Sequence, residues 1–126
     1  MTLSAQQGKV VIVNLWASWC GPCRAEMPAI QKLYEANKDR GLEVLAVNST
    51  FQDTETDARA FIQNLNLTLP VLLDKDGAVS RRYLLRALPS TFIIDRQGLI
   101  RAVLVGGPVS KAVLQTKIES LLSETP

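Results

Sequence analysis

Two cysteines separated by a Gly-Pro dipeptide, in the segment Trp-Cys-Gly-Pro-Cys at residues 19–23, limit what this chain can be more than any other feature. Cys20 and Cys23 are the only cysteines in the sequence. The apolar run before them, residues 10–16, is typical of a buried strand, and residues 24–34 after them are typical of a helix. Two thiols one helical turn apart, at the start of a helix that follows a strand, favour reversible disulfide chemistry.

The composition excludes several kinds of partner and several kinds of metal or catalytic site. A chain of 126 residues is one domain, and 47% hydrophobic with 21% charged residues is ordinary for a globular protein. The net charge of +2 is too small to indicate nucleic acid or an anionic membrane as partner. No histidine occurs, which excludes Cys/His zinc sites, a Ser-His-Asp triad and His-assisted copper sites. We therefore expect a single domain over residues 1–126, without a metal ion.

The sequence leaves the cellular compartment open. No stretch is long and apolar enough to span a bilayer, and residues 1–9 lack the charged and apolar regions of a signal peptide. Either the protein is cytoplasmic, or its leader or anchor has been removed. The cysteine pair does not decide between them, because a dedicated reductant can keep such a pair reduced in either compartment.

Hydrophobic periodicity predicts strands alternating with helices. The expected strands are residues 10–16, 42–47, 69–73, 91–95 and 99–105, and the expected helices are residues 22–39, 54–65, 78–85 and 109–122. Crossover helices between the first strands imply parallel pairing there, and the turn at residues 96–98 predicts a hairpin that adds antiparallel edge strands. The pattern predicts an α/β fold, with a central mixed sheet flanked by helices on both faces.

The helix N-terminus predicts different roles for the two thiols. Unpaired backbone N–H groups and the helix dipole favour the thiolate of Cys20, which we expect to face solvent and to attack. Cys23 lies further inside and would resolve the mixed disulfide, while Pro22 restricts the loop between them. Trp19 is expected to cover the disulfide and contact a partner. A purely structural disulfide is the alternative, but so short a loop gains little from closure.

Resolution by Cys23 requires a group that accepts its proton, and no histidine is present. Glu26 lies three residues after Cys23, so its carboxylate shares that face of the helix. A partly buried carboxyl with a raised pKa could take the proton. It could equally be an acid in the first turn, favoured by the helix dipole. Asn14, on the preceding strand, cannot titrate and is at best a hydrogen-bonding group.

Leu88 and Pro89 directly precede a predicted strand. A cis peptide bond here would place the backbone of Leu88 beside the cysteine pair and offer its N–H and C=O groups to a bound peptide. An ordinary trans proline that opens a strand is the alternative. The residues alone favour the trans form, because only about 5–6% of X–Pro bonds are cis.

Three segments together resemble TlpA/ResA-like proteins of the thioredoxin fold. Residues 16–28 resemble the active-site segment of that family, residues 88–98 resemble its cis-proline loop and hairpin, and residues 48–85 resemble its helix-containing insert. The resemblance extends over about residues 3–122. One departure is that almost nothing precedes residues 3–9, where relatives usually have a strand or hairpin. We expect an N-terminal edge that is naturally short or has been trimmed.

The resemblance assigns roles to particular residues. It implies that Pro89 is cis and that Glu26 acts in acid–base chemistry. Asn14 stands where plain thioredoxins carry a buried aspartate, which fits a proton acceptor moved to Glu26. The implied catalytic residues are Cys20, Cys23 and Glu26, and the implied substrate-binding residues are Trp19, Gly21, Pro22, Leu88 and Pro89.

The resemblance also implies a function. Relatives reduce disulfides in proteins outside the cytoplasm, apocytochrome c being the best-known target, and take electrons from another dithiol protein. We therefore expect a monomeric thiol-disulfide oxidoreductase, periplasmic or membrane-tethered, that needs no cofactor besides its own cysteine pair. Two alternatives stay open. One is a peroxiredoxin-like peroxidase, for which Thr91 and Arg24 are poor substitutes for the usual Thr and Arg beside the cysteine. The other is a redox sensor or Cu(I) carrier, for which Met27 is the only candidate third sulfur.

Overall fold

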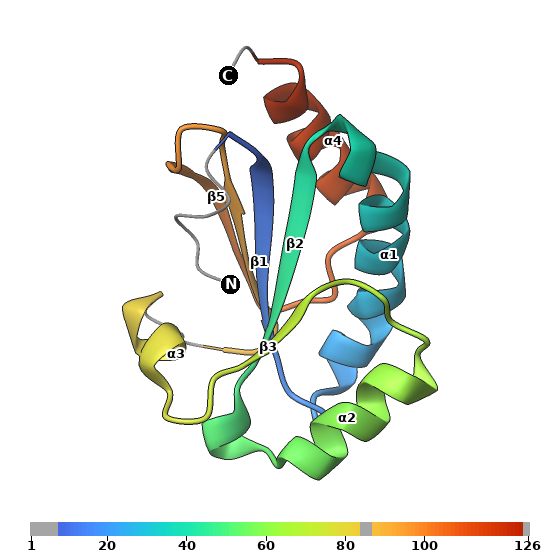
Figure 1. Ribbon diagram of the computed structural model, residues 1–126, viewed down its shortest axis with the longest axis vertical. Helices are drawn as coiled ribbons and strands as arrows, with labels where there is room; N and C mark the ends of the chain where they lie inside the picture. Colours follow the sequence, from blue (N-terminus) through green and yellow to red (C-terminus); the bar gives the residue numbers. More distant parts are fainter. Residues whose placement is uncertain (1–7, 84–86, 125–126) are drawn as a thin grey trace.

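A computed structural model describes residues 8–83 and 87–124 of the chain, and all structural statements refer to these residues. The strands of the sheet stand in the order β3-β2-β1-β4-β5 (Figure 1). Their bounds are β1 Val10–Trp16, β2 Leu42–Asn48, β3 Val71–Leu73, β4 Ser90–Ile94 and β5 Ile100–Val105. The helices are α1 Gly21–Asn37, α2 Glu55–Asn64, α3 Ala78–Arg82 and α4 Lys111–Leu122. Short 3₁₀ turns cover Lys38–Arg40 and Thr50–Gln52.

Strand β1 occupies the centre of the sheet. All seven of its residues are buried, as its apolar run predicted. It pairs in parallel with β2 and antiparallel with β4, so the predicted parallel crossover and antiparallel hairpin are both confirmed. The expectation that both hairpin strands lie at the edge is wrong, because β4 pairs with β1 as well as with β5. Only β5 is the edge strand on that side of the described sheet.

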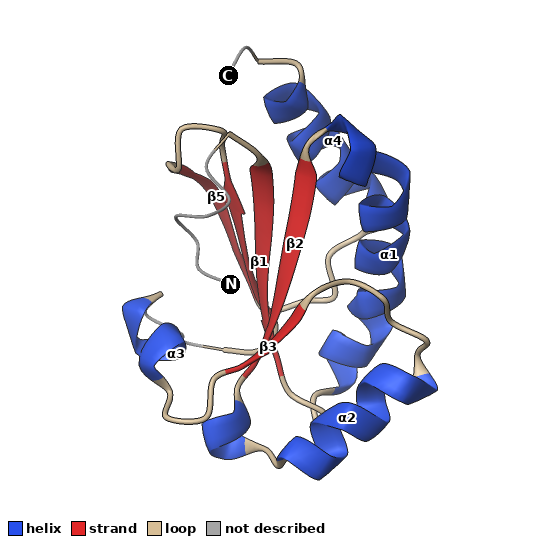
Figure 2. Cartoon of the chain, in the orientation of Figure 1, coloured by secondary structure: helices blue, strands red, loops and turns tan. Residues whose placement is uncertain are grey.

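Helices cover both faces of the sheet, but unequally (Figure 2). Helices α1, α2 and α4 pack on one face around the main core, which includes Ile12, Trp16 and Phe61. The smaller core on the other face includes Val13 and Leu15, with residues of α3 packed against it. Because side chains alternate along a strand, β1 sends its even-numbered residues toward α1 and its odd-numbered residues toward α3. The predicted fold class is confirmed.

Helix α1 begins where the sequence suggests but ends slightly earlier. Cys20 is its N-cap, and Pro22 stands in its first turn, where a missing N–H costs nothing. The helix continues through Pro28 and ends at Asn37, two residues before the expected end. Gly41 then closes the following 3₁₀ turn in the left-handed conformation, with φ of 99°.

The insert after β2 carries α2, β3 and α3. Thr54 caps α2 as predicted, since its hydroxyl oxygen accepts a hydrogen bond from the N–H of Asp57 at 3.1 Å. The last residues of the insert, 84 and 85, lie outside the described residues, as does residue 86. So does most of the expected short N-terminal edge, of which residues 1–7 are not described. Within the described ranges, no helix has the length and apolar character needed to cross a membrane.

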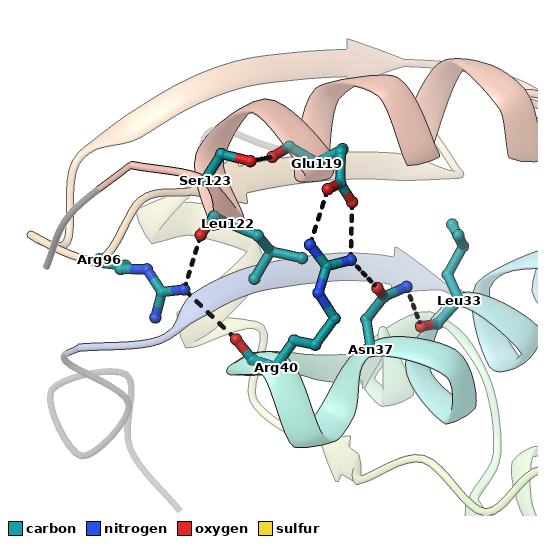
Figure 3. Close-up of polar contacts among 7 residues, drawn as sticks. All are labelled: Leu33, Asn37, Arg40, Arg96, Glu119, Leu122 and Ser123. Atoms are coloured by element: carbon teal, nitrogen blue, oxygen red, sulfur yellow. Dashed lines mark hydrogen bonds and ion pairs between the residues drawn. The ribbon is translucent and has the colours of Figure 1, made fainter.

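Arg96, in the turn between β4 and β5, hydrogen-bonds to three other segments, and Figure 3 shows its contacts with Arg40 and Leu122. Its guanidinium donates to the carbonyl oxygens of Gly8 at 3.0 Å, Leu122 at 3.1 Å and Arg40 at 3.4 Å. Leu122 ends α4, and Arg40 follows α1. Carbonyl groups at the C-terminal ends of helices lack hydrogen-bond donors within the helix. A cationic side chain that donates to two such ends therefore stabilises both of them.

Replacing Arg96 with glutamine should destabilise the fold. The amide cannot reach three carbonyl oxygens in different directions, and we expect a loss of about 2 kcal/mol in the free energy of unfolding. Urea unfolding followed by circular dichroism measures the change. Arg59→Gln is the matched control, because Arg59 is exposed and forms its ion pair with Glu55 on its own helix. Equal effects of the two substitutions would contradict the role assigned to Arg96.

Candidate active site

Cys20 and Cys23 form a disulfide at the start of α1, with their Cα atoms 5.2 Å apart. Cys20 precedes the first helical residue, and its Sγ accepts a hydrogen bond from the N–H of Cys23 at 3.1 Å. The sulfur therefore occupies the position that a capping oxygen takes in other helices. Gly21 and Pro22, which separate the cysteines, are exposed.

The expectation that Cys20 faces solvent is wrong for the disulfide form. Cys20 is 4% exposed and Cys23 is 1% exposed, so both belong to the main core. The physical reason lies in the capping geometry. The side chain of Cys20 turns back over the first turn of α1, where it is bonded to Cys23, and Cys23 points into the interior. Whether Cys20 is accessible as a thiolate depends on the dithiol form, in which that bond is absent.

Glu26 lies one helical turn after Cys23 and is 2% exposed. One carboxyl oxygen, Oε1, accepts hydrogen bonds from the side-chain amide of Asn14 at 3.2 Å and from the hydroxyl of Thr91 at 3.1 Å. The other, Oε2, accepts from the backbone N–H of Val109 at 3.1 Å. Strand β1, strand β4 and the loop before α4 thus each supply one donor to the same carboxyl group.

Burial raises the pKa of Glu26 above the ordinary value for glutamic acid. The hydrogen bonds from Val109, Thr91 and Asn14 favour the charged form and act in the opposite direction, but the loss of hydration outweighs them. Asn14 contributes only a hydrogen bond, as predicted. A carboxyl group held in this way can take up and release a proton nearer to neutral pH than an exposed one.

The peptide bond between Leu88 and Pro89 is cis, as the family resemblance implied and the residues alone did not. Pro89 is buried, and Leu88 is half-buried and packs against both cores. The carbonyl oxygen of Pro89 accepts a hydrogen bond from the N–H of Gly106 at 2.8 Å. The loop after β5 is therefore attached to the loop before β4.

The two tryptophans that flank the cysteine turn have different environments. Trp16 is completely buried and stacks on Phe61, with ring centroids 4.5 Å apart. Trp19 is 60% exposed, and its indole N–H donates to the carbonyl oxygen of Gln52 at 2.8 Å. The indole of Trp19 is thus held against the insert while its ring remains open to a partner.

Asp53 is a residue of this region that the sequence analysis missed. Its carboxylate accepts hydrogen bonds from the N–H and the hydroxyl of Ser18, both at 2.7 Å, and from the side chain of Asn48 at 3.0 Å. Burial alone would raise the pKa of Asp53, but the hydrogen bonds from Asn48, Ser18 and Thr54 together lower it. An isolated aspartate before a helix gives no sign of such long-range partners. Through its bonds to Ser18, Asp53 connects the segment before Cys20 to the insert.

The residues that the two alternative functions require are engaged elsewhere. The hydroxyl of Thr91 hydrogen-bonds to Glu26, and the guanidinium of Arg24 lies over the ring of Phe61 at 4.9 Å. Met27, the candidate third sulfur for Cu(I), is completely buried in the main core. Over residues 8–83 and 87–124, no three His, Cys, Asp or Glu side chains gather where they could hold a metal ion.

Replacing Glu26 with glutamine should remove a dependence of stability on pH. Because the pKa of Glu26 is raised on folding, its favourable contribution is complete below the pKa of an unfolded glutamate, about 4.3. That contribution is lost as the pH rises through the pKa in the folded protein. The difference in unfolding free energy between the two proteins should change between these values, by up to about 1.4 kcal/mol per pH unit.

Urea unfolding of the disulfide form between pH 4 and 9 measures this difference. The exposed Glu35 provides the matched control Glu35→Gln. Stability curves for wild type and Glu26→Gln that run parallel over the whole range would show that Glu26 titrates alike in the folded and unfolded chains.

The chain is similar to known proteins in sequence. Residues 1–103 match the AhpC/TSA family. The thioredoxin-like protein YneN of Bacillus subtilis (strain 168) is 41% identical over 115 residues, which are 90% of this chain and 66% of that protein. The thiol-disulfide oxidoreductase ResA of Geobacillus kaustophilus (strain HTA426) is 34% identical over 94% of this chain and 67% of that protein. The chain spans about two thirds of the length of these two relatives.

Solved structures agree with the sequence relatives. A crystal structure of a protein from Chlorobium tepidum, assigned as the thiol:disulfide interchange protein DsbE, has a TM-score of 0.90 and 34% identity. The match covers 98% of this chain and 86% of that one. The crystal structure of StoA from Bacillus subtilis has a TM-score of 0.77 and 28% identity, over 87% of this chain and 82% of that one. The chain therefore belongs to the AhpC/TSA family and, among proteins of the thioredoxin fold, to the ResA-like thiol-disulfide oxidoreductases.

Proposed function

We propose that this protein reduces disulfides in other proteins through Cys20 and Cys23. The observation that carries the proposal is the closed pair at the N-terminus of α1, one turn before a buried carboxyl group with a raised pKa. A structural disulfide would need no such acid. Membership of the ResA-like oxidoreductases supports the same chemistry.

The exchange takes place in two steps. The Cys20 thiolate attacks one sulfur of the target disulfide, so that a mixed disulfide forms and the other target sulfur leaves as a thiolate that takes up a proton. The Cys23 thiolate then attacks Sγ of Cys20 and releases the second target sulfur. The target gains two electrons and two protons, and the Cys20–Cys23 pair is left as the disulfide. No cofactor is required.

Glu26 is the proposed acceptor of the Cys23 proton. The thiol must lose this proton before it can attack, and the carboxyl group on the same face of α1 is ionised above its own pKa. A raised pKa makes the carboxylate a stronger base than an exposed glutamate, which general base catalysis near neutral pH requires. The three groups that hydrogen-bond to it are uncharged, so none of them competes as a base.

Substrate is proposed to bind across the cysteine turn and the Leu88–Pro89 loop. The exposed ring of Trp19 offers an apolar contact, and Gly21 and Pro22 present a surface without bulky side chains. An extended segment of the target can pair with the backbone of Leu88 as a short added strand. Such a surface would recognise the backbone and the apolar side chains of a target, and it therefore suits a partly unfolded protein.

The partners and the compartment are proposed from family membership. A second dithiol protein would reduce the Cys20–Cys23 disulfide after each cycle, and the domain would act as a monomer. We place the reaction outside the cytoplasm, in the periplasm or tethered to a membrane, with the haem-binding cysteines of apocytochrome c among the targets.

A Cys23→Ser variant should trap the mixed disulfide. Without the resolving sulfur, the bond between Cys20 and the target persists and appears as a covalent adduct on non-reducing gels and in mass spectra. Insulin is a suitable target, and Cys20→Ser is the matched control, which should form no adduct. In the same Cys23→Ser protein, iodoacetamide should alkylate Cys20 faster than it alkylates free cysteine at pH 7.

Two results would contradict this assignment. Full insulin reduction by Cys23→Ser would show that Cys23 does not resolve the intermediate. Alkylation no faster than that of free cysteine would show that Cys20 stays covered in the dithiol form, as it is in the disulfide form. Consumption of peroxide without reduction of insulin would favour the peroxidase instead.

The reduction potential tests the direction of electron flow. The Gly-Pro dipeptide between the cysteines also occurs in thioredoxin, whose potential is about −270 mV. We expect a value near this for the Cys20–Cys23 couple, measured by equilibration with glutathione or dithiothreitol buffers and quantified by thiol alkylation. A potential near that of the oxidant DsbA, about −120 mV, would reverse the proposed direction.

A further inference from the structure

Residues 106–109, in the loop between β5 and α4, contact both parts of the proposed site. The N–H of Gly106 donates to the carbonyl oxygen of Pro89 at 2.8 Å, and the N–H of Val109 donates to Oε2 of Glu26 at 3.1 Å. The loop contains the run Gly106-Gly107-Pro108, which breaks the chain after β5. In the structure this break brings a backbone donor, 83 residues away in sequence, to the buried carboxyl group.

Gly107 stands at the point of closest approach within this loop. A Cβ atom at residue 107 would lie 2.8 Å from Oε2 of Glu26 and 2.9 Å from Cγ of Pro89. Real Cβ atoms essentially never come so close to other heavy atoms. Neither neighbour can give way easily, because the proline ring is rigid and the carboxyl group is held by three donors.

A left-handed backbone conformation does not explain the glycine at this position. Gly106 has φ of 78°, in the left-handed region that favours glycine, but Gly107 does not have a positive φ. The requirement at residue 107 is therefore one of space. Any side chain would separate the loop from the carboxyl group or from the proline.

The contact between the loop and Glu26 affects the proton affinity of the carboxyl group, because of what surrounds that group. The groups that hydrogen-bond to the carboxyl come from β1, from β4 and from the loop, and none of them is charged. On its own helix, the Cys23 thiol of the reduced form is the titratable neighbour one turn away, and the guanidinium of Arg24 is turned to Phe61. In the described part of the chain, burial therefore acts on a carboxyl group whose hydrogen-bond donors are all uncharged.

We propose that Gly107 is a positioning residue for proton transfer, because its missing side chain allows the loop of residues 106–109 to close over Glu26 and fix its carboxyl group beside Pro89. The proposal rests on the function assigned above to Glu26. Gly107 itself takes no part in the exchange. It acts through the carboxyl group, by keeping water out and by holding the Val109 N–H on Oε2.

Gly107→Ala in the full chain tests the proposal. The added methyl group should lift the loop and admit water, which hydrates the carboxylate and replaces the lost donor. The pKa of Glu26, followed by the ¹³C shift of its carboxyl carbon in NMR titrations, should then fall toward the ordinary range. The pH midpoint of the resolving step should fall in parallel, and its rate at pH 7 should drop by up to about tenfold, less than the ~100-fold that general base catalysis can supply.

Gly98→Ala is the matched control for destabilisation. Gly98 lies in the β4–β5 turn with φ of 85°, and nothing lies within 4 Å of a Cβ built there. Its substitution should lower the melting temperature without changing the titration of Glu26. An unchanged Glu26 titration in Gly107→Ala would overturn the proposal.

A measurement on the wild type tests whether the loop holds the Glu26 carboxyl group, even if Gly107→Ala does not fold. The amide resonance of Val109 should shift with pH at the same midpoint as the Glu26 carboxyl, and the shift should vanish in Glu26→Gln. A Val109 amide that does not respond to this titration would show that the loop does not hold the carboxyl group. By contrast, an unchanged resolving rate and pH profile in Glu26→Gln would refute the catalytic role of Glu26, while the NMR titrations would still report on the loop.

Discussion

A single buried carboxyl group connects the parts of the structure on which the chemistry depends. Glu26 belongs to α1, the helix that carries the cysteines, and it accepts hydrogen bonds from β1, from β4 and from the loop before α4. The cis-proline loop is attached to the same assembly through Gly106. If the carboxyl group were replaced by an apolar side chain, three donors would lose this acceptor, and two of those hydrogen bonds are buried, which makes the loss costly.

The burial of Glu26 lowers the stability of the fold but suits its proposed function as a base. Burying a group that can ionise weakens the fold at every pH at which the group is charged, and the three hydrogen bonds only partly offset the lost hydration. The same burial raises the pKa of the carboxyl group and makes it a stronger base. At the opposite end of the sheet, Arg96 hydrogen-bonds to the carbonyl groups of Arg40, in the turn after α1, and of Leu122, at the end of α4.

The fold and the central motif could be predicted from the sequence because their signals are local. The apolar run of β1, the cap and proline at the start of α1, and the turn between β4 and β5 each lie within a few adjacent residues. The errors and omissions concern contacts between distant segments. The Ser18 partner of Asp53 leaves no trace near that aspartate in the sequence, and the contact between Gly107 and Glu26 joins segments that are over 80 residues apart.

The sequence by itself determined the α/β order of elements, the cysteine pair at a helix N-terminus and the acid one turn later, since spacing along one helix is set by backbone geometry. Tertiary structure decided what those residues experience. It buried both cysteines in the disulfide form and surrounded the carboxyl group of Glu26 with uncharged donors from three segments. Hydration, which governs exposure and proton affinity, depends on every segment packed around a group, and only the folded chain defines that set.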